Sequence, residues 1–386
     1  MISSNAGVLA MLLGVCAFWF YLEKASRWKI FDYLPPLIFI YATPVLLTNT
    51  GVIATDSAVY GSIRQILLPM MLVLLLLKVD VGAAFRVMGK GVFVMLSGTL
   101  GVMVGAPIAF LLVKHGLGPE GWKAFGTLAG SWIGGTGQMA AVTDMIDTPG
   151  FEFGLAVIAD NSVYVVWLPI LLASRNFAKR FARFARVSED RLEMMEKAAR
   201  DAVHEESTPR FTDYLYLLFI AAAVTWISIE LGNRLPTSDV ISASTWKILL
   251  VSTIGVGLSF TPLRRIAGSH ELAMAFVYLF VARMGASAHF EGEGAAGQIM
   301  WFLIGSFIWI FIHGAFCLAA ARIFRVDVHT AAIASAANIG GAASAPIVAS
   351  YHNESLVPAS ILLALIGYAI GTHAAWITAL VCRALA

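Results

Sequence analysis

Long apolar stretches recur along almost the whole chain, and charged residues are confined mainly to the short segments between them. A helix needs about 20 apolar residues to cross a hydrocarbon core of roughly 30 Å, and most of these stretches approach that length. The pattern predicts an all-α polytopic membrane protein with about 12 transmembrane helices (roughly 11–13). The expected ranges are 6–22, 33–53, 62–79, 90–114, 122–146, 151–174, 211–232, 244–261, 270–287, 297–322, 329–350 and 355–382.

Composition supports this interpretation. Of the 386 residues, 59% are hydrophobic and 13% are charged, whereas soluble domains carry about 25% charged residues. The formal net charge is only +2, so it gives no indication of a nucleic-acid partner. We therefore expect the protein to be surrounded by the lipid bilayer and not to bind nucleic acid.

One polar segment, residues 175–210, interrupts the apolar pattern and divides the chain into halves at 1–174 and 211–386. Its first part alternates aromatic and basic residues at helical spacing, which is typical of a helix lying on an anionic membrane surface. The aromatic face comprises Phe177, Phe181 and Phe184, and the basic face comprises Lys179, Arg180, Arg183 and Arg186. We interpret the segment as a cytoplasmic linker; an ordinary solvated loop helix is the alternative.

The two halves contain similar sequences. Residues 130–138 (GSWIGGTGQ) align with residues 336–344 (AANIGGAAS) at an offset of 206 residues, and the same offset pairs the neighbouring apolar ranges. An internal repeat in an all-helical membrane protein is typical of transporters. We therefore predict two structural repeats.

The orientation of these repeats is indicated by local charge. Lys78 and Lys90 suggest that the loop before the range 90–114 is cytoplasmic, whereas Glu291 and Glu293 suggest that the equivalent second-half loop is outside. The two motifs lie in the fifth and the eleventh of these ranges, six spans apart, and this even number would make the repeats parallel. A broken or re-entrant helix is easily miscounted, so we expect inverted repeats and a counting error between residues 91 and 210.

Each repeat carries two adjacent glycines in the middle of an apolar range, at Gly134-Gly135 and at Gly340-Gly341. Paired glycines weaken a helix and admit backbone conformations that other residues avoid. A break at membrane depth frees backbone N–H and C=O groups, which attract ions and are tolerated only beside a cavity or inside protein. Close helix packing through small residues is the alternative. Polar neighbours favour a binding site: Ser131, Thr136, Gln138, Asn338 and Ser344.

Asp160 lies ten residues into the range that follows the first break, about 15 Å along a helix and near the bilayer centre. An acid at this depth must be paired, hydrated or protonated for part of the time, which makes it a candidate functional group. We expect Asp160 to bind a coupling ion, H⁺ or Na⁺, within reach of Thr136, Gln138 and Asn161. A structural salt bridge to Lys78 or Arg283 is the alternative.

The predicted substrate or ion site gathers these residues: Ser131, Trp132, Gly134, Gly135, Thr136, Gln138, Asp160, Asn161, Asn338, Gly340, Gly341 and Ser344. Arg283, inside the range 270–287, is either the counter-charge of the substrate or a tether within a scaffold. His313 is interpreted as a hydrogen-bonded core histidine. Asp144 and Asp147 border a loop, and a solvated helix end explains them.

The sequence lacks the usual motifs of soluble enzymes. It has no phosphate-binding glycine loop, no Gly-x-Ser-x-Gly elbow and no His-Glu-x-x-His zinc motif. We therefore expect no enzyme activity, no ATPase drive of its own and no cofactor. The only metal that we expect is a coupling Na⁺ near Asp160.

Four segments resemble the YjcL-like family of bacterial membrane proteins: residues 118–123 (GPEGWK), 130–135 (GSWIGG), 159–161 (ADN) and 338–341 (NIGG). The resemblance extends over essentially the whole chain. The family is similar in arrangement to the cation:proton antiporter and anion transporter superfamily, which includes bile-acid and glutamate carriers.

This resemblance implies a multi-pass protein of the bacterial inner membrane with an inverted-repeat fold. Two broken helices would cross at mid-membrane, with the Gly-Gly pairs as crossing points, in a mobile core beside a scaffold that often forms homodimers. Asp160-Asn161 would correspond to the acidic pair of the antiporters. Three departures affect what can be carried over. Ala342 stands where relatives often have proline, relatives often have an asparagine near the position of Gln138, and the pair at 160–161 holds only one acid.

Three functions fit these observations. The first is an elevator-type secondary active transporter that moves a small anionic organic solute coupled to Na⁺ or H⁺. The second is a monovalent cation/proton antiporter, and the third is a non-transporting receptor, scaffold or intramembrane enzyme. Basic residues in the cavity would favour an anionic solute, whereas an acid-only cavity would favour cation exchange.

Overall fold

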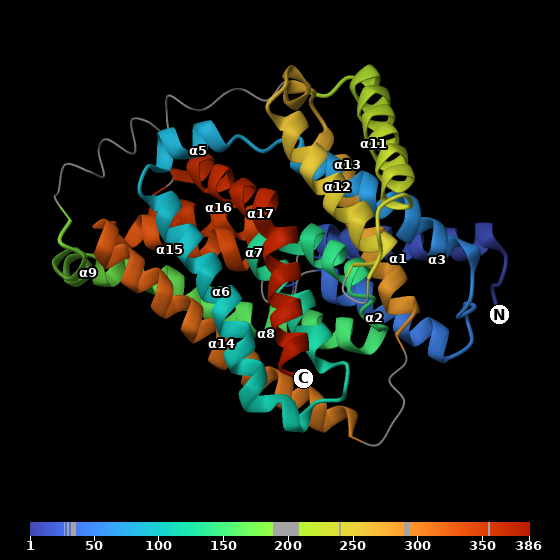
Figure 1. Ribbon diagram of the computed structural model, residues 1–386, viewed down its shortest axis with the longest axis horizontal. Coiled ribbons are helices and arrows are strands. Elements are labelled where there is room, and N and C mark those ends of the chain that lie inside the picture. Colours follow the sequence, from blue (N-terminus) through green and yellow to red (C-terminus); the bar gives the residue numbers. More distant parts are fainter. Residues whose placement is uncertain are drawn as a thin grey trace.

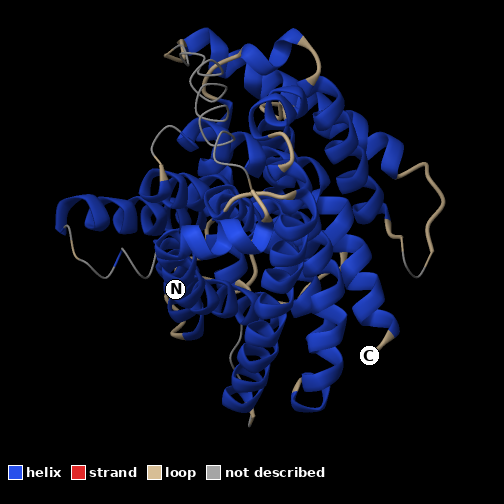
Figure 2. Ribbon diagram, turned by 90° about the vertical axis from the view of Figure 1, so that its left-hand side faces the viewer, coloured by secondary structure: helices blue, strands red, loops and turns tan. Residues whose placement is uncertain are grey.

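The computed structural model describes residues 1–26, 28, 31, 36–187, 208–238, 241–288, 294–353 and 356–386. Helices and connecting loops make up this described part, with no strand in it (Figure 2). The all-α prediction is confirmed, and each expected range contains helix in its described residues. Glu291, Glu293 and most of the charged linker, residues 188–207, lie outside the described residues.

The first half contains α1 (Asn5–Ser26), α2 (Pro36–Asn49), α3 (Ala58–Ser62), a π-helical segment (Ile63–Leu67), α4 (Leu68–Leu76), α5 (Val81–Met88), α6 (Gly91–Val113), α7 (Gly121–Met145), α8 (Gly150–Ser174) and α9 (Ala178–Ala185). The second half contains α11 (Phe211–Gly232), α12 (Ala243–Ser259), α13 (Ser269–Ala286), α14 (Ala295–Phe324), α15 (Val328–Ile339), α16 (Gly341–His352) and α17 (Val357–Ala384).

Seven helical stretches in the described chain are long and apolar enough to cross a membrane. They are Asn5–Ser26, Ala58–Leu76, Gly91–Gly116, Gly150–Ala185, Phe211–Gly232, Ala295–Phe324 and Val357–Ala384. The shorter helices α2 and α12 are also apolar. These helices support a multi-pass membrane protein, and the total of about twelve crossings stays a prediction.

The segment α7 consists of two legs that fold back on each other at Gly135. Gly135 has φ 77° and ψ −174°, which interrupts the helix. The hydroxyl oxygens of Thr127 and Thr143 lie 3.4 Å apart across 16 positions, whereas a continuous helix would separate them by about 24 Å. The predicted break is therefore confirmed, but α7 is a helical hairpin rather than a helix that continues across the membrane.

A second hairpin is formed by α15 and α16. Gly341 has φ 58°, and the chain reverses there so that Nδ1 of His329, near the start of α15, lies 2.9 Å from Nδ1 of His352, the last residue of α16. Each leg has 12 residues, a length of about 18 Å. Because such a leg is too short to cross the hydrocarbon core, this hairpin also has to enter and leave on one side.

The two hairpins approach each other from opposite ends of α8. This 25-residue helix starts at Gly150, directly after the base of the first hairpin, and near its other end the Leu171 carbonyl oxygen lies 2.9 Å from Nε2 of His352, at the base of the second. The tips meet midway, where a Cβ atom on Gly341 would lie 3.7 Å from Cα of Gly135. Two hairpins in contact at their tips replace the expected pair of crossing helices.

The helices form two groups. The hairpin group comprises α6, α7, α8, α14, α15, α16 and α17, and the platform group comprises α1, α2, α3, α4, α11, α12 and α13. In Figure 1 the platform group lies on the right, and α6, α14, α15 and α16 lie on the left. Within the hairpin group, α7 packs on α17 and α6 packs on α14; between the groups, α7 contacts α4, α12 and α13.

The predicted amphipathic helix forms part of the described structure as α9, which follows a short 3-10 turn at Arg175–Phe177. Phe177 at the end of the turn and Phe184 on α9 are exposed, and the rings of Phe181 and Phe184 lie 5.8 Å apart. Exposed aromatic side chains beside basic ones suit the interface of an anionic membrane leaflet.

We expect Ala182→Cys, in a background without the three native cysteines, to react with an impermeant maleimide added from the cytoplasmic side of oriented membrane vesicles. The physical reason is the positive charge of α9, which favours a cytoplasmic position. Labelling restricted to the periplasmic side would contradict this placement.

Candidate functional site

Asp160 lies on α8 and faces the first hairpin just before its tip. The Ser131 hydroxyl donates to Oδ2 of Asp160 at 3.0 Å, and the indole Nε1 of Trp132 donates to Oδ1 at 2.9 Å. Both donors belong to the first leg of α7. The buried ring of Trp132 is held by Trp309, with 4.5 Å between ring centroids. One polar contact therefore fixes each oxygen of the carboxylate.

No basic side chain pairs with Asp160 among the described residues. The alternative of a structural salt bridge to Lys78 or Arg283 is therefore not observed in this conformation. Asp160 is half-buried and has only neutral donors, so its ionised form is solvated by two hydrogen bonds and lacks a counter-charge. A group in that position can bind a cation or take up a proton.

Two of the side chains expected around Asp160, those of Asn161 and Gln138, point elsewhere. The Asn161 amide donates to the Val157 carbonyl of its own helix at 2.8 Å, because consecutive residues project about 100° apart around a helix. Gln138, beyond the tip, donates to the backbone carbonyl of Tyr368 at 3.2 Å. Ser131 and Trp132 are thus the predicted residues that the structure brings to Asp160.

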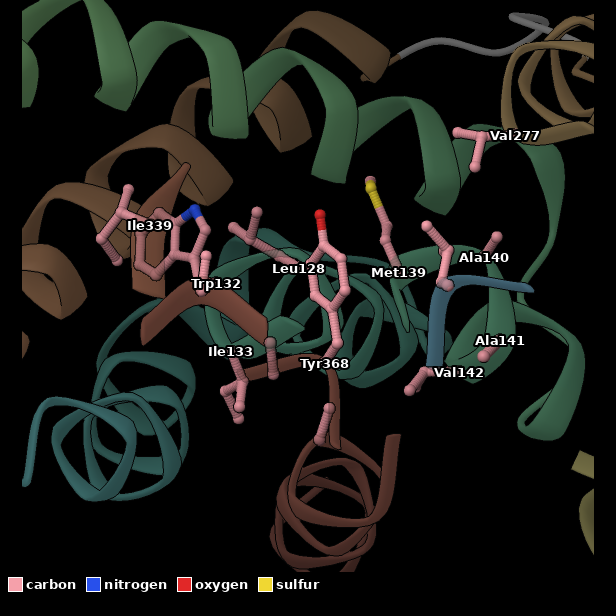
Figure 3. Packing of buried hydrophobic residues seen from close by; sticks show 14 of the residues in the cluster. Leu128, Trp132, Ile133, Met139, Ala140, Ala141, Val142, Val277, Ile339 and Tyr368 are labelled. Atoms are coloured by element: carbon pink, nitrogen blue, oxygen red, sulfur yellow. The ribbon is translucent and has the colours of Figure 1, made fainter. Parts of the chain in front are cut away.

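Tyr368 on α17 lies against both hairpin tips. Ideal Cβ atoms on Gly135 and Gly341 would lie 3.3 Å and 3.7 Å, respectively, from its ring atom Cε1. Figure 3 shows its ring between Trp132 and Met139, which flank the first tip. Nothing in the sequence indicates this position for Tyr368, because an aromatic residue in an apolar span carries no local signal of a contact with a distant helix break.

Tyr164 connects Asp160 to the second tip. It follows Asp160 by one helical turn on α8, and a Cβ atom on Gly340 would lie 3.2 Å from its ring atom Cε2. Its buried hydroxyl has no hydrogen-bond partner of good geometry among the described residues. Ser344 lies beside the same tip, next to Gly340. One face of α8 therefore lies beside both tips, with Asp160 next to the first and Tyr164 next to the second.

The polar residues of the second hairpin pack mainly into the hairpin group. The buried Asn338 amide hydrogen-bonds the Thr99 hydroxyl on α6 at 2.9 Å. His313 is fully buried, with its ring nitrogens 2.9 Å from the Gly98 carbonyl oxygen and from the Ser335 hydroxyl. The interpretation of His313 as a hydrogen-bonded core histidine is confirmed.

A buried ion cluster joins the base of the first hairpin to the platform group. Asp144 on α7 is 3% exposed, pairs with Arg64 and accepts bonds from Nζ of Lys247 at 3.0 Å and from the Ser244 hydroxyl at 2.6 Å. The interpretation of Asp144 as part of a solvated helix end is wrong, because platform residues distant in the sequence cover it. Asp147, whose side chain is 79% exposed, does lie in solvent and pairs with Arg64 at 2.8 Å.

Comparison with known proteins identifies the family of the chain. The family model described as "Protein of unknown function (DUF819)" matches residues 10–385, almost the whole chain. The chain belongs to this family. It is also similar to the Bacillus subtilis (strain 168) protein named "Uncharacterized membrane protein YjcL", with 26% identity over 363 residues, covering 91% of this chain and 90% of that protein. The YjcL-like resemblance seen in the sequence is thereby confirmed.

Proposed function

We propose that the protein is an elevator-type secondary active transporter that moves a small anionic organic solute, with Na⁺ or H⁺ as the coupling ion at Asp160. The observation that carries the proposal is the contact between two Gly-Gly hairpin tips beside a carboxylate that has no basic partner in the described chain. The proposal involves no enzyme activity and no cofactor. The proposed assembly is a homodimer in the bacterial inner membrane.

The position of Asp160 suits a cation. Its two donors, Ser131 and Trp132, occupy the last turn of the leg that ends at the Gly134-Gly135 tip. The carbonyl end of a helix carries partial negative charge, and carbonyl oxygens freed at a break can coordinate a cation together with a carboxylate. The second leg of the other hairpin, α16, begins at Gly341 beside this tip. Because the N–H end of a helix attracts anions, this end of α16 suits an anionic solute.

The hairpin geometry also supports inverted repeats. A hairpin returns to the side from which it starts. Between the two hairpins, five helices of the described chain coincide with expected spans: α8, α11, α12, α13 and α14. If each of these crosses once, the odd number places the hairpins on opposite sides, in agreement with their approach from opposite ends of α8. The counting error expected between residues 91 and 210 then corresponds to α7. Hairpins that enter from opposite sides suit a core that opens alternately to each side.

A panel of radiolabelled small solutes in proteoliposomes, with imposed sodium or proton gradients, tests the proposal. Accumulation of one organic anion above its equilibrium level only when a gradient is present would support it. Gradient-driven exchange of Na⁺ for H⁺ without any organic solute would favour the antiporter alternative, for which the lone acid at Asp160 is the supporting observation. Neither activity in well-inserted protein would favour a non-transporting role.

A further inference from the structure

A cavity of about 280 Å³ lies between the base of the first hairpin and the platform group. Its walls combine charged side chains, hydroxyl groups and apolar side chains, among them Phe280 and Met284. The charged residues that line it are Arg64, Asp144, Asp147 and Arg283. Arg64 comes from the π-helical segment and Arg283 from α13, whereas both acids come from the hairpin base.

The charges around this cavity do not balance. Arg64 and Lys247 are paired with Asp144, and Arg64 also reaches Asp147. The two bases and two acids of this cluster neutralise each other. Arg283 remains as an additional positive charge, with no carboxylate partner among the described residues.

The guanidinium of Arg283 is also poor in hydrogen bonds. Its buried Nε has no acceptor in the described part of the chain. Nη1 lies 2.9 Å from the sulfur of Met284, which is a weak acceptor. A partly buried guanidinium without a partner is costly, and a planar carboxylate can accept two parallel hydrogen bonds from it.

We propose that this cavity binds a small monocarboxylate whose carboxylate group pairs with the guanidinium of Arg283. The volume admits a solute of a few carbon atoms, whose apolar part can contact Phe280 and Met284. Arg283 supplies the single positive charge that the cluster leaves unbalanced. It neutralises a monoanion, whereas a phosphate dianion would keep one uncompensated charge in the cavity and bind less well.

The role of this site in transport rests on the proposed function. Gly150, which lines the cavity, precedes Asp160 by ten residues on α8, about 15 Å along the helix. The cavity therefore lies at one end of the path that leads along α8 to the hairpin tips. It serves as the docking site for the solute on the side from which the first hairpin enters.

Binding is tested on the purified full-length protein in nanodiscs by thermal unfolding at constant ionic strength. The probes are propionate, pyruvate and benzoate, each with its neutral amide, and inorganic phosphate. We expect at least one carboxylate to raise the unfolding midpoint by several degrees, while its amide and phosphate leave it unchanged, because a ligand that binds only the folded state stabilises it.

Three variants test whether the carboxylate raises the unfolding midpoint by binding in this cavity. Arg283→Gln should abolish this shift, and Ser287→Leu, which keeps the guanidinium but fills the space, should abolish it too. Arg264→Gln is the matched control, because Arg264 pairs with Asp80 away from the cavity, and it should keep the full shift.

An equal carboxylate shift in Arg283→Gln, a phosphate shift as large as that of the carboxylate, or no carboxylate shift in the wild type would overturn the proposal. The result is independent of transport. If a carboxylate raises the unfolding midpoint but no gradient-driven uptake occurs, the binding site is supported and the transport function is refuted. If uptake occurs but no carboxylate changes the midpoint, only this binding site is refuted.

Discussion

Replacing Gly135 or Gly341 by leucine is expected to abolish solute uptake while the protein still inserts into the membrane. The backbone at Gly135 occupies a region that essentially only glycine adopts, and Gly341 has a positive φ. Side chains there would also press on Tyr368 and separate the two tips. The measurement is initial uptake in proteoliposomes, normalised to the amount of inserted protein.

Gly14→Leu and Gly257→Leu are the matched controls. Both glycines lie in helices, α1 and α12, and an ideal Cβ atom at either position meets no other atom within 4 Å. These variants should transport like the wild type. Full transport by both tip variants would refute a functional contact between the hairpin tips.

Asp144→Ala is expected to destabilise the protein by about 3–5 kcal/mol, because removing one partner from a buried ion cluster leaves the remaining charges uncompensated. Lys247, with a side chain 10% exposed, would lose its partner, and Arg64 would keep only Asp147. The loss would also weaken the contact between the hairpin and platform groups. The free energy of unfolding in mixed micelles, measured by denaturant titration, checks the magnitude.

Asp147→Ala is the natural comparison, since it removes a carboxylate from the same cluster at an exposed position. An exposed ion pair contributes about 0–1 kcal/mol, so this variant should unfold almost like the wild type. Equal effects of the two substitutions would show that burial of Asp144 does not control the stability of the cluster.

Local sequence signals predicted the helices and the positions of both breaks. Apolar runs located the helices, and the paired glycines located the points where the backbone leaves helical geometry, at Gly135 and Gly341. Depth along the expected range 151–174 also marked Asp160 as a candidate, and its carboxylate lies beside the first hairpin with two neutral donors. These features depend on properties of neighbouring residues, which a single sequence contains.

Long-range contacts could not be predicted in the same way. The sequence of an apolar range of 25 residues is compatible with one continuous helix and with a hairpin. Contacts between residues far apart in the range, such as Thr127 with Thr143, distinguish the two. The even number of spans was the one sign of this difference. Likewise, two partners of Asp144 lie far away in the sequence, Arg64 by 80 positions and Ser244 by 100, so nothing near Asp144 in the sequence indicates its burial.

The coupling role of Asp160 is tested most directly by comparing wild type and Asp160→Asn in proteoliposomes with and without a proton or sodium gradient. Asparagine keeps the shape and can still accept from Trp132, so the variant should fold with an unchanged unfolding midpoint. The wild type should accumulate solute above equilibrium, with a rate that changes with pH. Asp160→Asn should at most equilibrate the solute and show a flat pH profile. Unchanged accumulation and an unchanged pH profile in Asp160→Asn would contradict the proposed mechanism.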